Sequence, residues 1–168
     1  PLENITQVTY SVPNFNTKIN LLKHLLQTNE NMSRVLVFVN NKKISDMVHT
    51  RIEEDFEGQF GVIHSNKSQN YRLSTMAEFQ EGNLRGLITT DIMARGLDIS
   101  NITHVSNFEM PELPELYMHR IGRTGRADAT GTAISFIAPR EEESKFAIEL
   151  LMDMELSIEP FPESVEVS

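Results

Sequence analysis

Short apolar runs alternate with amphipathic stretches along the chain. The run Val35–Val39 is apolar throughout, as is typical of strands that are covered on both faces of a sheet. Between such runs, apolar residues recur at helical spacing, for example at Ile19, Leu22, Leu25 and Leu26. The pattern predicts strands over residues 8–12, 35–39, 61–64, 87–90, 103–108 and 132–137. It predicts helices over residues 17–27, 42–56, 68–80 and 141–154, and another that follows the prolines at 111 and 114.

Strands that alternate with helices over short loops favour a parallel sheet with right-handed crossovers. We therefore expect an α/β fold of three layers, in which a mostly parallel sheet of about six or seven strands is covered by helices on both faces. The chain has 168 residues, the size of one ordinary domain. Residues 1–160 are expected to form this domain, and the acidic, proline-containing tail 161–168 is expected to be flexible.

Composition narrows the class of protein. The chain has no cysteine, which excludes disulfides and thiolate metal sites, and we expect no bound metal. It shows no apolar run of membrane-spanning length and no signal-peptide pattern, so we expect a cytoplasmic protein without a membrane partner. The net charge of −9 is unusual for a nucleic-acid binder, because phosphate neutralisation needs cations. Local basicity survives in residues 85–127, which hold arginines at 85, 95, 120, 123 and 126.

Residues 119–126 read His-Arg-Ile-Gly-Arg-Thr-Gly-Arg and suit a ligand that carries several phosphate oxygens. A guanidinium is a permanently charged planar fork whose donors match phosphate geometry. Arginines at every third position predict that Arg120, Arg123 and Arg126 line one side of a helical turn. The simpler alternative is a solvated basic stretch at the end of a helix.

A second polar stretch, Thr89–Ile99, follows a predicted strand. Ligands of open parallel sheets bind at the carboxyl ends of the strands. Asp98 is placed to accept hydrogen bonds from a sugar hydroxyl, and Thr90 to donate to a phosphate. The alternative for Asp91 is that it only caps a helix that begins at Ile92.

These two stretches carry a resemblance to a known family. The sequence TDIMARGLD at 90–98 is similar to the T-D-x-x-A-R-G-x-D motif of DEAD-box RNA helicases, and HRIGRTGR at 119–126 matches their last motif at every position. VLVFVNN at 35–41 resembles their fourth motif, and QNYR at 69–72 resembles their Q-x-x-R motif. The matches extend over residues 3–155 in the order of the family's second RecA-like domain, and His119 favours the DEAD-box branch. The resemblance thus implies a RecA-like fold.

The resemblance also implies roles for individual residues. Arg123 and Arg126 would reach the ATP γ-phosphate, with Arg126 as the arginine finger, and Asp98 and Gly96 would complete the nucleotide contacts. RNA would be contacted by Thr90, by the backbone at Gly96, by Arg72 and by Asn41, which stands where threonine is commoner. Structural or interdomain roles fall to the remaining matched residues, which are His119, Arg120, Arg95, Gln69 and Phe38. For Arg120 the resemblance leaves open a carboxylate partner inside the domain, for Arg95 it suggests one near its own loop, and Phe38 is expected in the core.

The chain contains neither a G-x-x-x-x-G-K-[ST] phosphate loop nor an Asp-Glu-Ala-Asp string. In the family both belong to the first RecA-like domain, which also holds the magnesium ion. We therefore expect the second domain of an ATP-dependent RNA helicase, whose partners are RNA and the N-terminal RecA-like domain. The isolated domain is expected to be monomeric, to hold no cofactor tightly and not to hydrolyse ATP.

Two other functions remain open at this point. The acidic balance and the missing first domain allow a non-catalytic RecA-like interaction module of an RNA-processing assembly. A DNA-directed helicase of the same superfamily is the third reading, which His119 disfavours.

Overall fold

The computed structural model describes residues 2–97, 99–126 and 129–168, and within them six parallel strands form one sheet in the order β1-β6-β5-β2-β4-β3. The strands are β1 (Ile5–Ser11), β2 (Val35–Phe38), β3 (Phe60–Ile63), β4 (Gly86–Thr89), β5 (His104–Asn107) and β6 (Gly131–Ile137). The helices are α1 (Phe15–Thr28), α2 (Lys42–Glu53), α3 (Gln69–Gln80), α4 (Asp91–Arg95), α5 (Pro114–Ile121) and α6 (Glu142–Met152). Two single 3-10 turns, η1 (Leu2–Asn4) and η2 (Pro139–Glu141), complete the elements. The expected three-layer α/β fold with its parallel sheet is confirmed.

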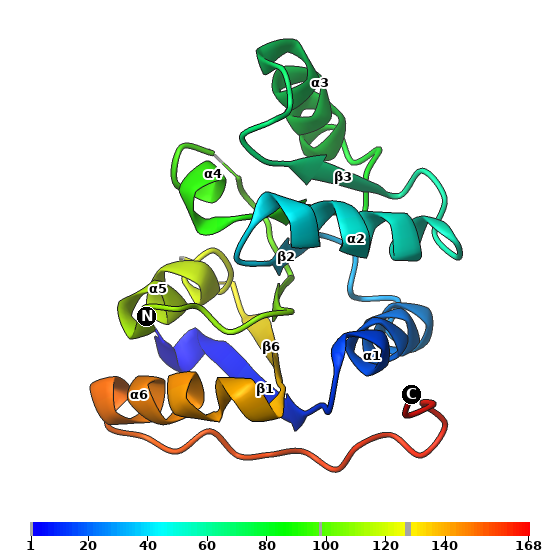
Figure 1. The fold of residues 1–168 in the computed structure, drawn as a ribbon. Coiled ribbons are helices and arrows are strands. Elements are labelled where there is room, and N and C mark those ends of the chain that lie inside the picture. The colour runs from blue at the N-terminus through cyan, green and yellow to red at the C-terminus, as the bar shows by residue number, and fades with distance from the viewer. Residues whose placement is uncertain (1, 98, 127–128) are drawn as a thin grey trace.

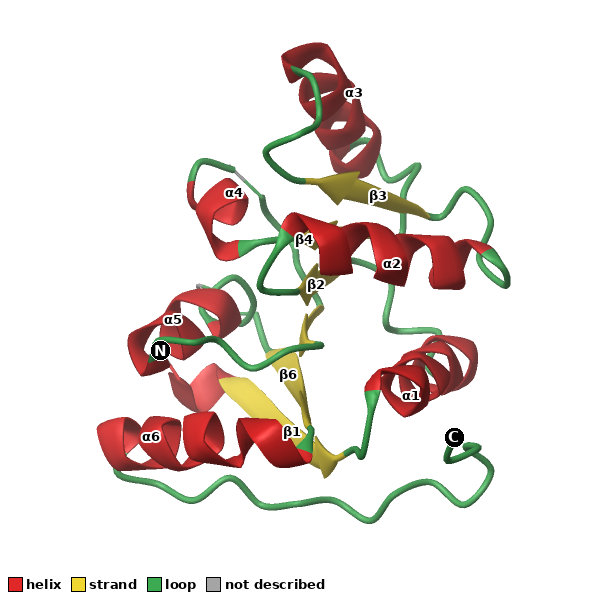
Figure 2. Ribbon diagram, in the orientation of Figure 1, coloured by secondary structure: helices red, strands yellow, loops and turns green. Residues whose placement is uncertain are grey.

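Helices α1 and α2 cover one face of the sheet, and α3, α4, α5 and α6 cover the other (Figures 1 and 2). Strand β2 shows why both faces are buried. Val35 and Val37 pack into the cluster under α1 and α2, whereas Leu36 and Phe38 pack into the cluster under α3 and α4. A strand whose alternate residues enter two cores must be apolar at every position, which explains the unbroken run in the sequence.

The helix that precedes the arginines ends earlier than the sequence suggested. Helix α5 stops at Ile121, with Gly122 as its C-cap, so Arg123 and Arg126 lie in the following turn and not on one side of a helix. The turn that follows requires a glycine at position 125, because Gly125 adopts φ +64° and a Cβ there would lie 2.7 Å from Cγ1 of Ile5. The expectation of three arginines on one helical face is therefore wrong.

The C-terminal tail is attached to the domain, in contrast to the flexible segment that its acidic composition suggests. Ile158 forms a parallel bridge with Thr9 of the edge strand β1, and the Glu159 amide donates to the Thr9 carbonyl at 2.7 Å. Val165 is buried in the cluster under α1, and the Ser168 amide donates to Thr17 Oγ1. Figure 1 shows this segment running from α6 past β1 to α1. Buried apolar residues among the acids fix the tail in place.

Among the described residues, no helix combines the length and the apolar character that crossing a membrane requires.

Candidate functional site

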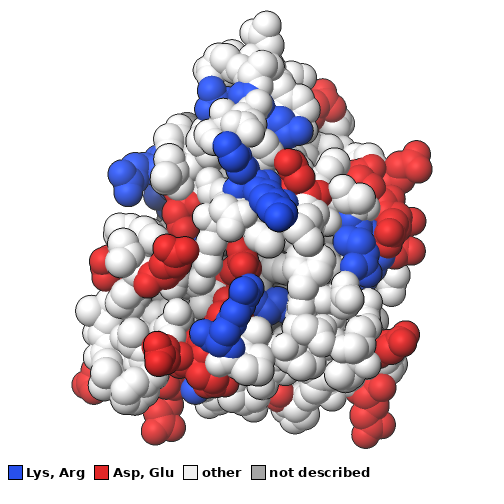
Figure 3. Space-filling view, viewed as in Figure 1, with Lys and Arg blue, Asp and Glu red and all other residues white. Residues whose placement is uncertain are grey.

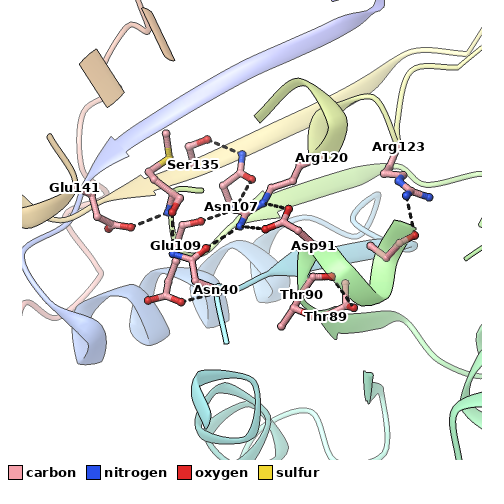
Figure 4. Close-up of polar contacts among 12 residues, drawn as sticks. Asn40, Thr89, Thr90, Asp91, Asn107, Glu109, Arg120, Arg123, Ser135 and Glu141 are labelled. Atoms are coloured by element: carbon pink, nitrogen blue, oxygen red, sulfur yellow. Dashed lines mark hydrogen bonds and ion pairs between the residues drawn. The ribbon is translucent and has the colours of Figure 1, made fainter. Parts of the chain in front are cut away.

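Loops from three strands meet at the carboxyl edge of the sheet, and Arg120 ties them together (Figure 4). Its side chain is 1% exposed. Nε and Nη2 donate to the two carboxylate oxygens of Asp91 at 2.7 and 2.8 Å, in a bidentate pair. Nη1 donates to the Glu109 carbonyl at 2.6 Å, and Nη2 also donates to Asn40 Oδ1 at 2.9 Å.

The Arg120 guanidinium has no donor left for a ligand. A longer contact of 3.3 Å runs from Nη1 to Asn107 Oδ1, and Asn107 in turn donates to Ser135 Oγ. The guanidinium also lies over the ring of Phe38, 5.1 Å from its centre, and Phe38 is buried. Arg120 therefore acts inside the domain, through the carboxylate of Asp91.

Asp91 is the first residue of α4, and its carboxylate pairs with Arg120, so it does not cap a helix that begins at Ile92. The N-cap position belongs to Thr90, whose side chain makes no capping bond. Within the described part of the chain, the half-buried Thr90 hydroxyl has no hydrogen-bond partner at all. That leaves it available to a ligand.

Arg123 and Arg126 lie away from the carboxyl edge. Helix α5 runs back along the sheet, and Thr124 beyond its end pairs with Ile102, just before β5 begins. Arg123 is half-buried, and its guanidinium donates to the carbonyls of Leu97 and Ala94 at 3.1 and 2.7 Å. Burial, together with the charge of Arg126, lowers the pKa of Arg123. Arg126 is exposed, and its side chain makes no hydrogen bond or ion pair to the described residues.

A shallow depression of about 600 Å³ lies between these arginines and α4. Its described lining contains no acidic residue and consists of Arg95, Gly96, Leu97, Met118, His119, Gly122, Arg123 and Arg126. Arg95 and His119 are exposed there, and Arg95 forms no ion pair with a described carboxylate. Three guanidiniums around one depression fit a group with several negative oxygens, such as the phosphates of ATP. Asp98, the expected ribose ligand, lies outside the described residues.

A second pocket, of about 410 Å³, lies at the carboxyl edge among α2, α4 and α5. It contains Thr90 and Asn41, two of the residues that the resemblance assigns to RNA. Asn41 caps α2, because its Oδ1 accepts from the Ile44 amide at 3.0 Å, which leaves its amide group as a donor. Lys42 donates to Asn66 Oδ1 at the rim.

Arg72 and Gln69 lie on α3, beside this pocket but not in its lining. Arg72 Nη2 donates to Gln69 Oε1 at 2.9 Å, and Nη1 contacts Met93 Sδ at 3.9 Å. Nε of Arg72 is buried without a partner among the described residues. Met93 lines the pocket, so Arg72 borders it through this methionine.

Several site residues carry no role in the sequence analysis, namely Asn40, Asn107, Glu109 and His64, and Asp91 is considered there only as a helix cap. His64 is 3% exposed; its Nδ1 accepts from the Asn66 amide and its Nε2 lies 3.0 Å from Asp46 Oδ1. The one signal that the sequence offers for these residues is that each is a polar residue at or just after the end of a predicted strand.

Charge is distributed unevenly over the face that contains the carboxyl edge. Figure 3 shows lysine and arginine side chains in a broken band from α3 down the middle of the view, whereas carboxylates gather on both sides of this band and along the bottom. The net charge of −9 therefore does not describe this edge of the molecule.

Comparisons with known proteins agree with this geometry. A family model described as the helicase conserved C-terminal domain matches residues 17–128. The ATP-dependent RNA helicase DBP2 of Candida albicans is 38% identical over 163 residues, which cover 96% of this chain and 28% of that protein. The chain thus spans less than a third of the length of this relative.

Solved structures show the same fold. The Escherichia coli DEAD-box protein SrmB, solved bound to regulator of ribonuclease activity A, superposes with a TM-score of 0.85 at 28% identity, over 98% of both chains. Saccharomyces cerevisiae Dbp5, solved bound to RNA and ADP BeF3, superposes with a TM-score of 0.84 at 29% identity, over 94% of this chain and 42% of that one.

Proposed function

The chain belongs to the DEAD-box RNA helicases, as a helicase C-terminal domain of that family, and from this premise we propose that it supplies half of an ATP-dependent RNA-remodelling site. In this proposal Arg123 and Arg126 contact the phosphates of ATP that an N-terminal RecA-like domain binds. Thr90, Asn41, Arg72 and the backbone at Gly96 contact the RNA.

The observation that carries the proposal is the different use of three arginines in one motif. All donors of the Arg120 guanidinium bind acceptors inside the domain, and the Arg123 guanidinium donates to the carbonyls of Ala94 and Leu97. Arg126 alone is exposed and unpaired among the described residues, beside an anchored neighbour. An exposed guanidinium with free donors, next to an arginine that is anchored, suits the stabilisation of charge on a transferring phosphoryl group.

The RNA side of the proposal rests on donors at the carboxyl edge. The free Thr90 hydroxyl, the Asn41 amide group and the cations Lys42 and Arg72 suit phosphate oxygens and 2′-hydroxyls. The Dbp5 relative solved with RNA and a nucleotide analogue supports the combination of both ligands. When both are bound, contacts made only in the closed arrangement of the two domains shift the population toward it.

Arg126→Ala tests the proposal in the protein that joins this chain to its N-terminal RecA-like domain. RNA-stimulated ATP hydrolysis is expected to fall by about 10³–10⁵, the usual contribution of an arginine finger. Arg140→Ala is the matched control, because Arg140 is an exposed arginine that lines neither the pocket nor the depression. ATPase activity close to wild type in the Arg126 variant would show that the finger assignment is wrong.

A docking module without catalysis is the second candidate, and one observation favours it. Helix α6 exposes Phe146, Leu150 and Leu151 on a surface that no described element covers. The SrmB relative was solved with a protein partner. If the wild-type protein that joins this chain to an N-terminal RecA-like domain shows no RNA-stimulated ATPase activity, the docking module is favoured over the helicase.

A further inference from the structure

The pocket at the carboxyl edge has two chemically different walls. One wall is polar and consists of residues that the proposed function assigns to the RNA backbone or that lie beside them, Asn41, Lys42 and Thr90. A second wall is formed by α4 and the start of α5 and is mainly apolar, because the Asp91 carboxylate in it is already bound by Arg120. Its apolar side chains are Ile92, Met93, Leu113 and Leu116.

The apolar wall is unusually open to water. Ile92 is 81% exposed and Leu113 is 55% exposed, although both belong to a concave site. Neither side chain belongs to a core cluster of the domain. An apolar wall in a pocket with a few free polar groups is the usual composition of a site for an organic ring or chain.

The charge of Glu112 indicates whether a phosphate or a base of an RNA fits against the apolar wall. It lines the same pocket and is exposed, and its carboxylate has no partner within the described ranges. A phosphate beside this carboxylate would be repelled, whereas the amino group of a base would donate to it. The polar wall therefore suits the backbone, and the apolar wall with Glu112 suits a base.

We propose that Ile92, Leu113 and Leu116 form the seat of one nucleobase, whose own backbone lies on the Thr90 and Lys42 wall, and that Glu112 accepts a hydrogen bond from its amino group. The inference rests on the proposed function, since it assumes that RNA occupies this edge. It adds a base contact to a domain whose sequence predicts backbone recognition alone.

The pocket then discriminates between bases. Cytosine, adenine and guanine each carry an exocyclic amino group that can donate to Glu112. Uracil presents carbonyl oxygens at the corresponding positions, which the carboxylate repels. Bases with an amino group are therefore favoured over uracil.

Fluorescence anisotropy with the 168-residue chain tests the proposal at low salt and about pH 7.5. The probes are labelled single-stranded RNAs of about 12 nucleotides: oligo(C), oligo(U) and a strand of the same length in which most sugars lack a base. We expect oligo(C) to bind about fivefold to tenfold more tightly than oligo(U), and the abasic strand to bind most weakly.

Two variants separate the parts of the seat. In Ile92→Ser/Leu113→Ser, the three RNAs should bind with affinities within about twofold of each other, because both side chains are exposed and their loss leaves the fold intact. In Glu112→Gln, the difference between oligo(C) and oligo(U) should fall to about twofold, whereas the abasic strand stays weaker. Leu150→Ser on α6 is the matched exposed control and should behave as wild type.

The outcomes distinguish this inference from the function on which it rests. If the wild-type chain binds the abasic strand as tightly as oligo(C), or if Ile92→Ser/Leu113→Ser keeps the base preference, the nucleobase seat is overturned while RNA binding stands. If Arg72→Ala leaves the affinity for all three RNAs unchanged, the proposed contact of Arg72 with the RNA backbone is wrong. The nucleobase seat is then decided by the comparison of oligo(C), oligo(U) and the abasic strand alone. If no RNA binds the wild-type chain, both are overturned.

Discussion

At the scale of single residues, the three arginines of residues 120–126 show how one residue type can take separate roles. Their spacing in the sequence is uniform, and nothing in it distinguishes a buried arginine from a free one. The difference arises because Arg120 meets Asp91 from α4 and the Glu109 carbonyl beyond β5. Those partners lie 29 and 11 residues away in the chain, and only the folded sheet brings them together.

Arg120→Ala is expected to lower the free energy of unfolding by roughly 3–5 kcal/mol, because it leaves the Asp91 carboxylate without its buried partner. Arg120→Lys keeps the charge and should still be less stable than wild type, since an ammonium group cannot form the bidentate pair or span the other acceptors. Urea unfolding measures both. Arg140→Ala, with its exposed side chain, should change stability by less than about 0.5 kcal/mol. An Arg120→Lys variant as stable as wild type would contradict the importance of this geometry.

At the scale of elements, strand β5 contains a buried histidine whose titration links stability to pH. Burial, and secondarily the charge of Arg85, lowers the pKa of His104 below its ordinary value of 6.5. The unfolded chain therefore takes up a proton first as the pH falls below about 6.5, and stability is lost from there down to the folded pKa. Above that window His104 is neutral in both states and its contribution is constant.

The melting temperature at about pH 5.5, relative to that at pH 7.5, should fall less in His104→Gln than in the wild type, because glutamine does not titrate. Thermal unfolding followed by circular dichroism at the two pH values measures the difference. The carboxylates titrate alike in both proteins, so the comparison isolates the histidine. Equal pH dependence in the two proteins would show that His104 is not the titrating group.

The C-terminal segment provides a matched pair of valines for a stability test. Val165 is buried in the cluster under α1, whereas Val167, two residues later, is 61% exposed. Val165→Ala should lower the free energy of unfolding by about 1–2 kcal/mol, because two buried methyl groups are lost. Val167→Ala should leave it within about 0.5 kcal/mol of wild type. Equal values for the two variants in urea unfolding would mean that the tail is not packed in solution.

The elements themselves are largely predictable from the sequence, and their ends are not. Buried strands such as β2 need an apolar residue at every position, and Ser68 caps α3 by accepting from the Tyr71 amide as its place in the sequence predicts. The turn after α5 depends on Gly125 fitting against Ile5, more than a hundred residues earlier in the chain. The packing of the tail is hard to predict, because Glu163 and Glu166 make a short segment look solvated, whereas Phe161 and Val165 pack against the cluster under α1.

At the scale of the whole molecule, the strand order places sequence-distant residues in one site. The order β1-β6-β5-β2-β4-β3 is set by crossovers, and no local pattern in the sequence reports it. Motif resemblance assigns ligand contacts to Thr90, Asn41 and Arg126, but it does not separate the pocket at the carboxyl edge from the depression beside α4. The apolar wall of that pocket has no motif and is visible only in the structure.

The salt dependence of RNA binding measures how many cations of the domain contact RNA phosphates. The proposed function assigns two cations, Lys42 and Arg72, to the RNA backbone. The logarithm of the affinity should therefore fall with the logarithm of the salt concentration with a slope of about −1.4. Lys42→Ala and Arg72→Ala should each reduce the slope by about 0.7. Titrations at several salt concentrations measure it. A slope that neither variant changes would place the phosphates elsewhere.

The pair between Arg120 and Asp91 joins two short helices whose ends border both sites. Helix α4 begins beside the pocket and ends at Arg95 and Gly96 in the depression, and α5 begins next to Leu113 and leads to Arg123. The ion pair joins the first residue of α4 to the last turn of α5, so it connects the pocket end of one helix to the depression end of the other. We therefore expect a contact that displaces the start of α4 at the pocket to be felt at the end of α5, next to Arg123. A substitution of Arg120 would remove this connection although Arg120 lines neither the pocket nor the depression.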